Sequence, residues 1–154
     1  MSKVLRSRTF PSRLNGDYLR KEIPLAIFST VFGLMYLNVG VQHFTNTAWF
    51  EPIVPGVLGD PTVWVLITGV MEIAIGVGLI LPWTRRYAAL SSMAFLMGIY
   101  WANLNMWVND IPLDGKTYAH HWHVLRLVAQ LGMMGLSFAI WRWTGADAAD
   151  SEQS

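Results

Sequence analysis

Residues 62–82, TVWVLITGVMEIAIGVGLILP, form an apolar run that is interrupted by one charged side chain, Glu72. An α-helix needs about 20 such residues to cross a hydrocarbon core of about 30 Å. Three further stretches, residues 24–44, 88–108 and 122–141, have nearly the same length and character. The sequence therefore predicts an all-α integral membrane protein, built as a bundle of four transmembrane helices.

The composition agrees with a membrane environment and excludes several kinds of chemistry. Of the 154 residues, 53% are hydrophobic and 14% are charged, whereas an average soluble chain carries about 25% charged residues. There is no cysteine, so disulfide exchange, cysteine-bound iron–sulfur clusters and covalently attached c-type haem are excluded. No phosphate-binding glycine loop and no nucleic-acid signature is present. Membrane lipids are the expected surroundings, and nucleic acid is not an expected partner.

The basic residues predict the orientation of the bundle in the membrane. Six of them precede residue 24, Arg85 and Arg86 fall between the second and third spans, and Arg142 ends the fourth, against Lys116 alone in the opposite loops. The positive-inside rule then places both termini in the cytoplasm. We expect a basic cytoplasmic arm at 1–23, a membrane domain at 24–143 and an acidic, disordered tail at 144–154.

Two segments outside the spans carry more apolar residues than free loops do. Phe10, Leu14 and Tyr18 would share one edge of a short interfacial helix, although a disordered arm near anionic headgroups explains the same composition. The loop at 45–61 contains TNTAWFEPIVPGVLGD. Its aromatic and aliphatic residues predict a segment that lies on the outer interface or dips into it.

Small residues predict where the helices meet, because close backbone approach supplies much of the packing energy inside a membrane. The expected contact stripes are Gly33 and Gly40 in the first span, Gly69 and Gly76 in the second, and Ala94, Gly98 and Ala102 in the third.

The polar side chains within the spans gather in their middle and outer parts. Glu72 falls near the midplane, where a carboxylate must face the bundle interior or water, be paired, or be neutral. It can pair with Arg126 and fix the register of the bundle, line a ligand pocket, or do both. The residues expected to contact a ligand are His43, Glu72, Asn103, His123, Arg126 and Gln130.

The histidine-rich stretch HHWHVLRLVAQ, residues 120–130, allows two interpretations. His120 and His123 share a helix face, and two neutral imidazoles at this spacing can hold a metal ion. However, no carboxylate lies among them, and His123, Arg126 and Gln130 descend one edge over about 10 Å. We expect this stretch to be the entrance and lining of a ligand pocket, with no metal site.

Several stretches resemble a known family. They are GVQHF (40–44), WFEPIVPGVLGDP (49–61), TGVMEIAIGVGLILPWTRRYAAL (68–90), WANLNM (101–106) and RLVAQ (126–130), and together they are similar to DoxX-type membrane proteins. This resemblance implies a four-helix bundle in a prokaryotic cytoplasmic membrane and an association with redox enzymes. The histidine run exceeds what the family pattern implies.

Two functions follow as expectations. In the first, the protein is a redox-associated subunit whose outer-half pocket binds a quinone or a similar lipid-soluble ligand, while a partner protein supplies the electrons. In the second, it is a structural or assembly subunit that packs against a larger membrane complex or forms a homo-oligomer, and the polar cluster only fixes the fold. No covalent cofactor is expected.

Overall fold

The computed structural model describes residues 16–152 and the side chains of residues 23–145. Four long helices and three short helical segments make up this part of the chain, which contains no strand. Phe10 and Leu14, the first two positions of the interfacial helix considered above, lie outside the described residues. The elements are α1 (Gly16–Thr45), α2 (Thr47–Phe50), η1 (Glu51–Ile53), η2 (Gly56–Leu58), α3 (Pro61–Ile80), α4 (Arg85–Val108) and α5 (His120–Glu152).

Three of the long helices contain segments that are long and apolar enough to cross a membrane: Ile23–Thr45, Pro61–Ile80 and His120–Gly145. The all-α membrane protein expected from the sequence is therefore confirmed at this level. Helix α4 has 24 residues but contains no segment as apolar as those three. Its hydropathy is lowered by polar side chains that make contacts inside the protein or line its cavity, namely Ser91, Ser92, Asn103 and Asn105.

Both ends of α3 are defined by local signals in the sequence. Asp60 caps the start, accepting a hydrogen bond of 2.9 Å from the Thr62 N–H, and Pro61 occupies the first helical position, where its missing N–H costs nothing. At the other end Thr84 donates to the Gly78 carbonyl at 2.9 Å, and Arg85 donates to the Leu79 carbonyl at 3.2 Å. These side chains satisfy carbonyls that a helix end leaves without partners.

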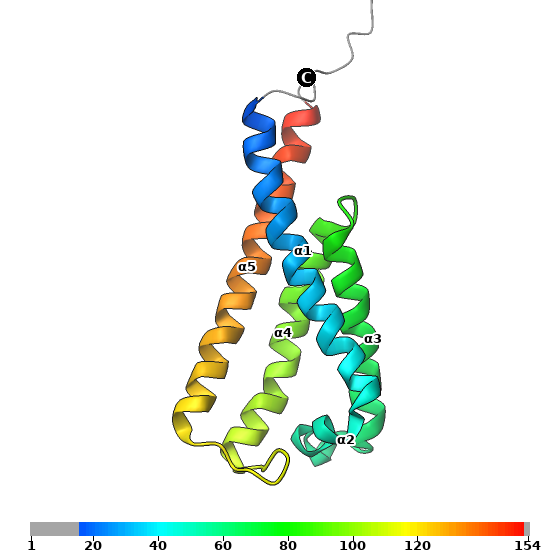
Figure 1. Cartoon of the computed structure of the whole chain (residues 1–154), viewed down its shortest axis with the longest axis vertical. Helices are drawn as coiled ribbons and strands as arrows, with labels where there is room; N and C mark the ends of the chain where they lie inside the picture. Colours follow the sequence, from blue (N-terminus) through cyan, green and yellow to red (C-terminus); the bar gives the residue numbers. More distant parts are fainter. Residues whose placement is uncertain (1–15, 153–154) are drawn as a thin grey trace, which may run out of the picture.

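The long helices form two pairs that meet at one end of the bundle and diverge toward the other. Helix α1 packs mainly on α3, and α4 packs mainly on α5. Figure 1 shows α1 beginning and α5 ending at the same end, which we call the terminal end. The segments at 46–60 and 109–119 lie at the opposite end, the loop end.

Glycines bring α1 and α3 into close contact. A Cβ atom added at Gly33 would lie 2.6 Å from the Gly76 carbonyl oxygen, and one added at Gly40 would lie 3.0 Å from the Gly69 carbonyl oxygen. Any side chain at Gly33 would thus meet the backbone of the facing helix. The contact stripes predicted for the first two spans are confirmed.

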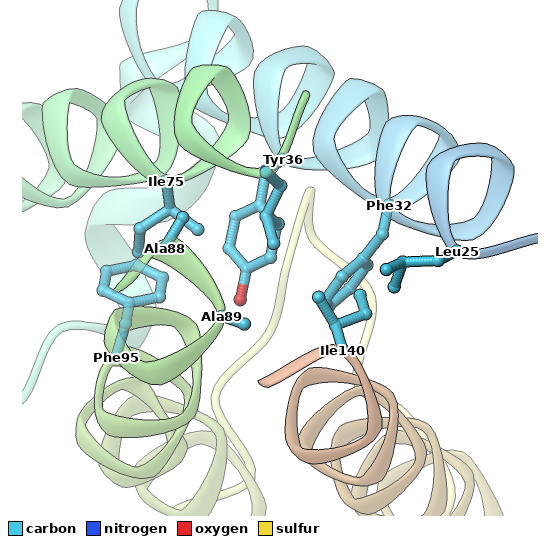
Figure 2. Close-up of a cluster of buried hydrophobic side chains, with 9 residues drawn as sticks. Leu25, Phe32, Tyr36, Ile75, Ala88, Ala89, Phe95 and Ile140 are labelled. Atoms are coloured by element: carbon cyan, nitrogen blue, oxygen red, sulfur yellow. The ribbon is translucent and has the colours of Figure 1, made fainter. Parts of the chain in front are cut away.

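The hydrophobic core lies where all four long helices meet, toward the terminal end. Phe32 and Tyr36 of α1 stack edge to face at 5.1 Å, and Tyr36 meets Phe95 of α4 in the same way at 6.2 Å. Figure 2 shows these rings between α3, α4 and α5. The other buried members of this cluster are Leu25, Ile75, Leu79, Ala88, Ala89 and Ile140.

A chain of hydroxyl groups joins three helices beside this core. Ser137 donates to the Met133 carbonyl at 2.9 Å, and a carbonyl can only accept. Ser92 must then donate to Ser137 at 2.9 Å, and Tyr36 must donate to Ser92 at 2.8 Å. The buried hydroxyls are therefore all hydrogen-bonded, and they connect α1, α4 and α5 at the level where the helix pairs begin to diverge.

Helix α5 continues to Glu152, over the segment for which the acidic composition predicts disorder. The sequence there, ADAAD from residue 146, is rich in alanine. Alanine has the highest intrinsic helix propensity, so a helix that has already formed can extend through it.

Candidate functional site

A cavity of about 820 Å³ lies between α3 and α4 on the loop-end side of the core. Pockets that hold small organic ligands have volumes of about 300–1,000 Å³. Carbon atoms form most of its wall, and five of its residues are aromatic: Trp49, Phe50, Trp64, Phe95 and Trp101. The cavity therefore suits a molecule that is itself largely apolar.

The segment at 47–58 folds over the cavity and closes its loop end. Phe50 meets the His43 ring edge to face, with 4.0 Å between the ring centres, and Asn105 donates to the Ile53 carbonyl at 3.2 Å. Trp64 donates to the Leu58 carbonyl at 2.7 Å. The apolar residues of this segment, predicted to lie on or dip into the membrane interface, thus contribute Trp49, Phe50, Ile53, Val54, Pro55 and Leu58 to the cavity wall.

His43 and Glu72 form the polar centre of the cavity. The His43 Nε2 atom lies 3.7 Å from the Glu72 Oε2 atom, and both side chains are less than a tenth exposed. On the other side of the ring, the Nδ1 atom lies 3.0 Å from the Val65 carbonyl oxygen. Because that carbonyl only accepts, Nδ1 carries a proton, and Nε2 of the neutral ring is an acceptor that faces Glu72.

The contact between these two side chains leaves hydrogen-bonding capacity unused. A separation of 3.7 Å is longer than a hydrogen bond, and the Glu72 Oε2 atom is buried without a hydrogen-bond partner. Buried polar atoms are nearly always paired in folded proteins. The unpaired oxygen at the wall of a cavity marks the point where a polar atom of a ligand would bind.

Arg126 also lines the cavity but contacts other groups. Its Nη1 atom lies 3.1 Å from the Met106 sulfur, and its guanidinium lies over the Tyr118 ring at 5.0 Å from the ring centre. The pair with Glu72 that the sequence suggests is replaced by the pair of Glu72 with His43. The reason is that α1 and α3 approach closely through their glycines, whereas Arg126 belongs to the other helix pair.

Asn103 and Gln130 link α4 to α5 at one side of the cavity. Asn103 donates to the Gln130 side-chain oxygen at 3.2 Å, and Gln130 donates to the Leu96 carbonyl. Asn103 lines the cavity, whereas Gln130 is buried behind it. Gln130 thus acts on the cavity only through the position of Asn103.

The histidines of α5 lie at the α4–α5 contact near the loop end. The His123 ring stacks on Trp107 with 5.6 Å between ring centres, and Trp107 donates to the Nδ1 atom of His120 at 3.2 Å. His123 is buried and its Nδ1 atom has no hydrogen-bond partner. Within the described residues no three His, Asp or Glu side chains gather as a metal site would require. It stays a prediction that residues 120–130 form the entrance and lining of a ligand pocket and hold no metal ion.

The predicted ligand contacts thus fall into two groups. The cavity wall brings together His43, Glu72, Asn103 and Arg126. His123 and Gln130 belong instead to the contact between α4 and α5. All six lie on the loop-end side of the core.

The small residues of α4 have a different role from the one predicted. A Cβ atom added at Gly98 would meet nothing within 4 Å, so no helix packs there. Ala94, Gly98 and Ala102 instead form part of the cavity wall. The expected helix contact at this stripe is wrong, because the facing helix α3 packs its own glycines on α1.

Sequence reasoning missed Thr68, Tyr118 and the cavity-facing positions of Trp49 and Phe50. The Thr68 hydroxyl lies 3.2 Å from the His43 Nδ1 atom and donates to the Trp64 carbonyl at 2.9 Å. Its position four residues before Glu72 puts both on one helix face, which could have identified it. No comparable signal exists for Tyr118, since it lies in an irregular segment.

Comparison with known families gives one match. The family model described as "Domain of unknown function (DUF8561)" matches residues 32–142. The chain belongs to the DUF8561 family. The match begins in α1, ends in α5 and includes every residue of the cavity wall, so the cavity lies entirely within the DUF8561 domain. Neither a curated protein nor a solved structure matches this DUF8561 protein.

Proposed function

We propose that this DUF8561 protein crosses a prokaryotic cytoplasmic membrane four times, with both termini in the cytoplasm. The proposal that α4 crosses is supported by its 24 residues, because a helix of that length is about 36 Å long. The orientation rests on the basic residues at the terminal end, among them Arg85, Arg86 and Arg142. The cavity would then open in the outer half of the bilayer.

We further propose that the cavity binds a quinone or a similar lipid-soluble ligand with a polar head. The observation that carries this proposal is the unpaired Glu72 Oε2 atom beside His43 Nε2 in a cavity whose wall is otherwise apolar. The apolar ring and tail of such a ligand would contact the apolar part of the cavity wall. A carbonyl or hydroxyl group of the ligand would take the hydrogen bond that Glu72 lacks.

The two side chains can serve both redox forms of such a ligand. A quinone carbonyl needs a donor, which protonated Glu72 or the Nε2–H of His43 in its imidazolium form provides. A quinol hydroxyl needs an acceptor, which the Glu72 carboxylate or the Nε2 lone pair provides. Reduction of a quinone to a quinol takes up two electrons and two protons. In this proposal His43 and Glu72 pass the protons and a redox partner protein supplies the electrons.

The resemblance to DoxX-type proteins is part of this proposal. It suggests a role beside a redox enzyme, and the stretches that carry it, from GVQHF in α1 to RLVAQ in α5, include His43, Glu72 and Arg126 of the cavity wall. We therefore expect a stoichiometric partner after gentle purification.

The second candidate function is an assembly subunit. It is supported by an apolar groove of about 330 Å³ between α1 and α5, which Gly132 keeps open. A helix of a larger complex would fit this groove with its side chains on Gly132. A stoichiometric large partner without an extracted ligand would favour this candidate.

Binding of a short-chain quinone to purified protein tests the first candidate. Trp49, Trp64 and Trp101 line the cavity, so a bound quinone should quench their fluorescence. Glu72→Met removes the hydrogen-bonding groups at nearly constant volume, and we expect about tenfold weaker binding from the loss of one buried hydrogen bond. Glu72→Gln keeps a donor but cannot transfer a proton, so it should bind and yet fail in partner-dependent reduction.

Asp110→Asn is the matched control for Glu72→Gln. It also replaces a carboxyl group by a carboxamide, but on an exposed loop outside the cavity. It should bind like the wild type. Mass spectrometry of lipids extracted from the wild type and from Glu72→Met provides a second measurement. Equal quinone affinity of the wild type and Glu72→Met would refute the proposed site.

A further inference from the structure

Helix α1 exposes a regular series of side chains on the face that points away from α3. Ile27, Val31, Leu34 and Val41 are 56%, 62%, 54% and 49% exposed. Asn38 and Thr45 are exposed as well. These six residues, which we call the α1 seam, run from Ile27 to the last residue of the helix.

The spacing of the α1 seam is that of a coiled coil. Successive members are four, three, four, three and four residues apart, which is the alternation of positions a and d in a heptad repeat. Val31, Asn38 and Thr45 take position a, and the remaining three take position d. Leucine occupies only one of the three d positions, Leu34, so the pairing is specified by the single asparagine at position a, Asn38. The pattern begins after Pro24, which would occupy the preceding a position.

Asn38 makes this face unsuited to lipid. Within the described part of the chain no hydrogen bond engages its carboxamide. It lies seven residues before the end of α1, and hence about 10 Å below that end of the helix. Lipid tails offer no hydrogen-bond partner at that depth. The exposed face of α5 differs, since its exposed residues from Val124 to Phe138 are all apolar or glycine.

The partner that fits this face is a second copy of the chain. Copies inserted in the same direction can be related by a twofold axis along the membrane normal. Each seam residue then meets its own counterpart at the same depth. A carboxamide carries both donors and acceptors, so Asn38 of one copy can pair with Asn38 of the other, as a buried asparagine at position a does in parallel dimers.

We propose that this protein forms a parallel homodimer through the α1 seam, with the two Asn38 side chains hydrogen-bonded to each other within the membrane. Gln42 follows the seam on its exposed side and can add a contact at the loop end. The cavity lies on the other face of α1, against α3 and α4. The proposed dimer therefore does not depend on whether the cavity binds the proposed ligand.

Disulfide trapping of single cysteines tests the interface directly, because the wild-type chain contains no cysteine. The probes are Val31→Cys and Asn38→Cys in membranes of the expressing cells, where all copies share one orientation. Leu131→Cys is the control, since Leu131 is 57% exposed on α5. Under mild oxidation we expect the two seam variants to form homodimers at least about tenfold faster than the control.

A second measurement addresses the role of Asn38. Energy transfer between labelled copies, followed as the protein is diluted with lipid, gives the dissociation constant of the dimer. Asn38→Leu should raise it roughly threefold to thirtyfold, the range for interhelical hydrogen bonds in membranes. Asn38→Gln should restore most of the affinity. Because Asn38 is exposed, both variants should keep the near-ultraviolet circular dichroism of the monomer fold.

Each alternative gives a different result. Disulfide formation by Leu131→Cys at the rate of Asn38→Cys, or an unchanged dissociation constant in Asn38→Leu, would overturn the proposal. A disulfide that joins the Asn38→Cys variant to a different polypeptide, identified by mass spectrometry, would assign the seam to another protein and overturn it as well.

Discussion

The contact between α1 and α3 and the facing walls of α3 and α4 use the same residue type for opposite purposes. Between α1 and α3, Gly33 faces Gly76, and an added Cβ atom would lie 2.6 Å from a backbone oxygen. On α4, Gly98 faces open space in the cavity wall. The sequence pattern around these glycines is similar. What differs is the surface that each glycine meets.

The comparison shows how one small membrane bundle can combine a closely packed helix contact with a large cavity. Glycine in a membrane helix permits close approach where the facing helix also presents glycine. One side of α3 is committed in this way to α1. The same side carries Glu72, which lies beside Gly40 and faces His43 of α1. Next to it, the small residues of α4 leave room for a cavity of about 820 Å³. The close contact between α1 and α3 thus positions the Glu72 carboxyl group at the wall of the cavity.

The largest loss of stability is expected when a side chain is placed in the tight contact between α1 and α3. Gly33→Leu places a side chain against the backbone of α3, and Gly76 has no side chain that could move away. Overpacked positions typically cost about 1–3 kcal/mol, and more where only backbone can give way. We expect a loss of about 3 kcal/mol or more in the free energy of unfolding, measured by denaturant titration in detergent micelles. A Gly33→Leu variant with wild-type stability would show that the helices are not in contact there.

Filling the cavity should weaken ligand binding and leave the stability of the fold unchanged. Gly98→Leu adds a side chain where nothing lies within 4 Å, so the fold should keep its stability while a quinone analogue binds at least about tenfold more weakly. Gly135→Leu is the matched control, because Gly135 also faces open space but lies outside the cavity. Binding is measured by tryptophan quenching. If Gly98→Leu destabilises the protein as much as Gly33→Leu does, Gly98 does not face open space as this comparison requires.

The sequence predicts the helices and the tight contact because both depend on local patterns. Apolar length identifies α1, α3 and α5 as candidate spans, and glycine spacing identifies the face that α1 and α3 share. The cavity depends on what faces Gly98, and that follows from how the helix pairs diverge. No local pattern encodes this divergence, so the sequence alone predicts a helix contact for the stripe on α4.

The candidate site could be predicted only in part for the same reason. The depth of a residue along a span can be counted from the sequence, and this places Glu72 near the midplane and His43, Asn103 and Arg126 in the outer parts of their spans. Which of them becomes the partner of Glu72 depends on which helices touch. Glu72 faces His43 because α1 and α3 are packed together, and Arg126 contacts Met106 and Tyr118 on its own side of the bundle.

A pair of double-mutant cycles should measure this partner choice. His43→Leu and Glu72→Leu remove two side chains that lie 3.7 Å apart, and groups in contact show interaction energies of about 0.5–3 kcal/mol. We expect about 1 kcal/mol for this pair. The cycle of Arg126→Met with Glu72→Leu should be additive to within about 0.5 kcal/mol. Thermal unfolding in detergent checks both, and a larger coupling for Arg126 would reverse the assignment.

A last comparison concerns the hydroxyl chain of Tyr36, Ser92 and Ser137, which lies where the two regions meet. Tyr36→Phe removes the first donor of the chain, and the cost should be about 1 kcal/mol, because Ser92 keeps its bond to Ser137. Ser92→Ala removes the middle member and leaves the buried Tyr36 hydroxyl without its acceptor. A stranded buried hydroxyl costs about 1–3 kcal/mol, so Ser92→Ala should be the more destabilising of these two changes. The reverse order in denaturant titrations would mean that Tyr36 finds another partner, and that the helix pairs are joined at this level by packing alone.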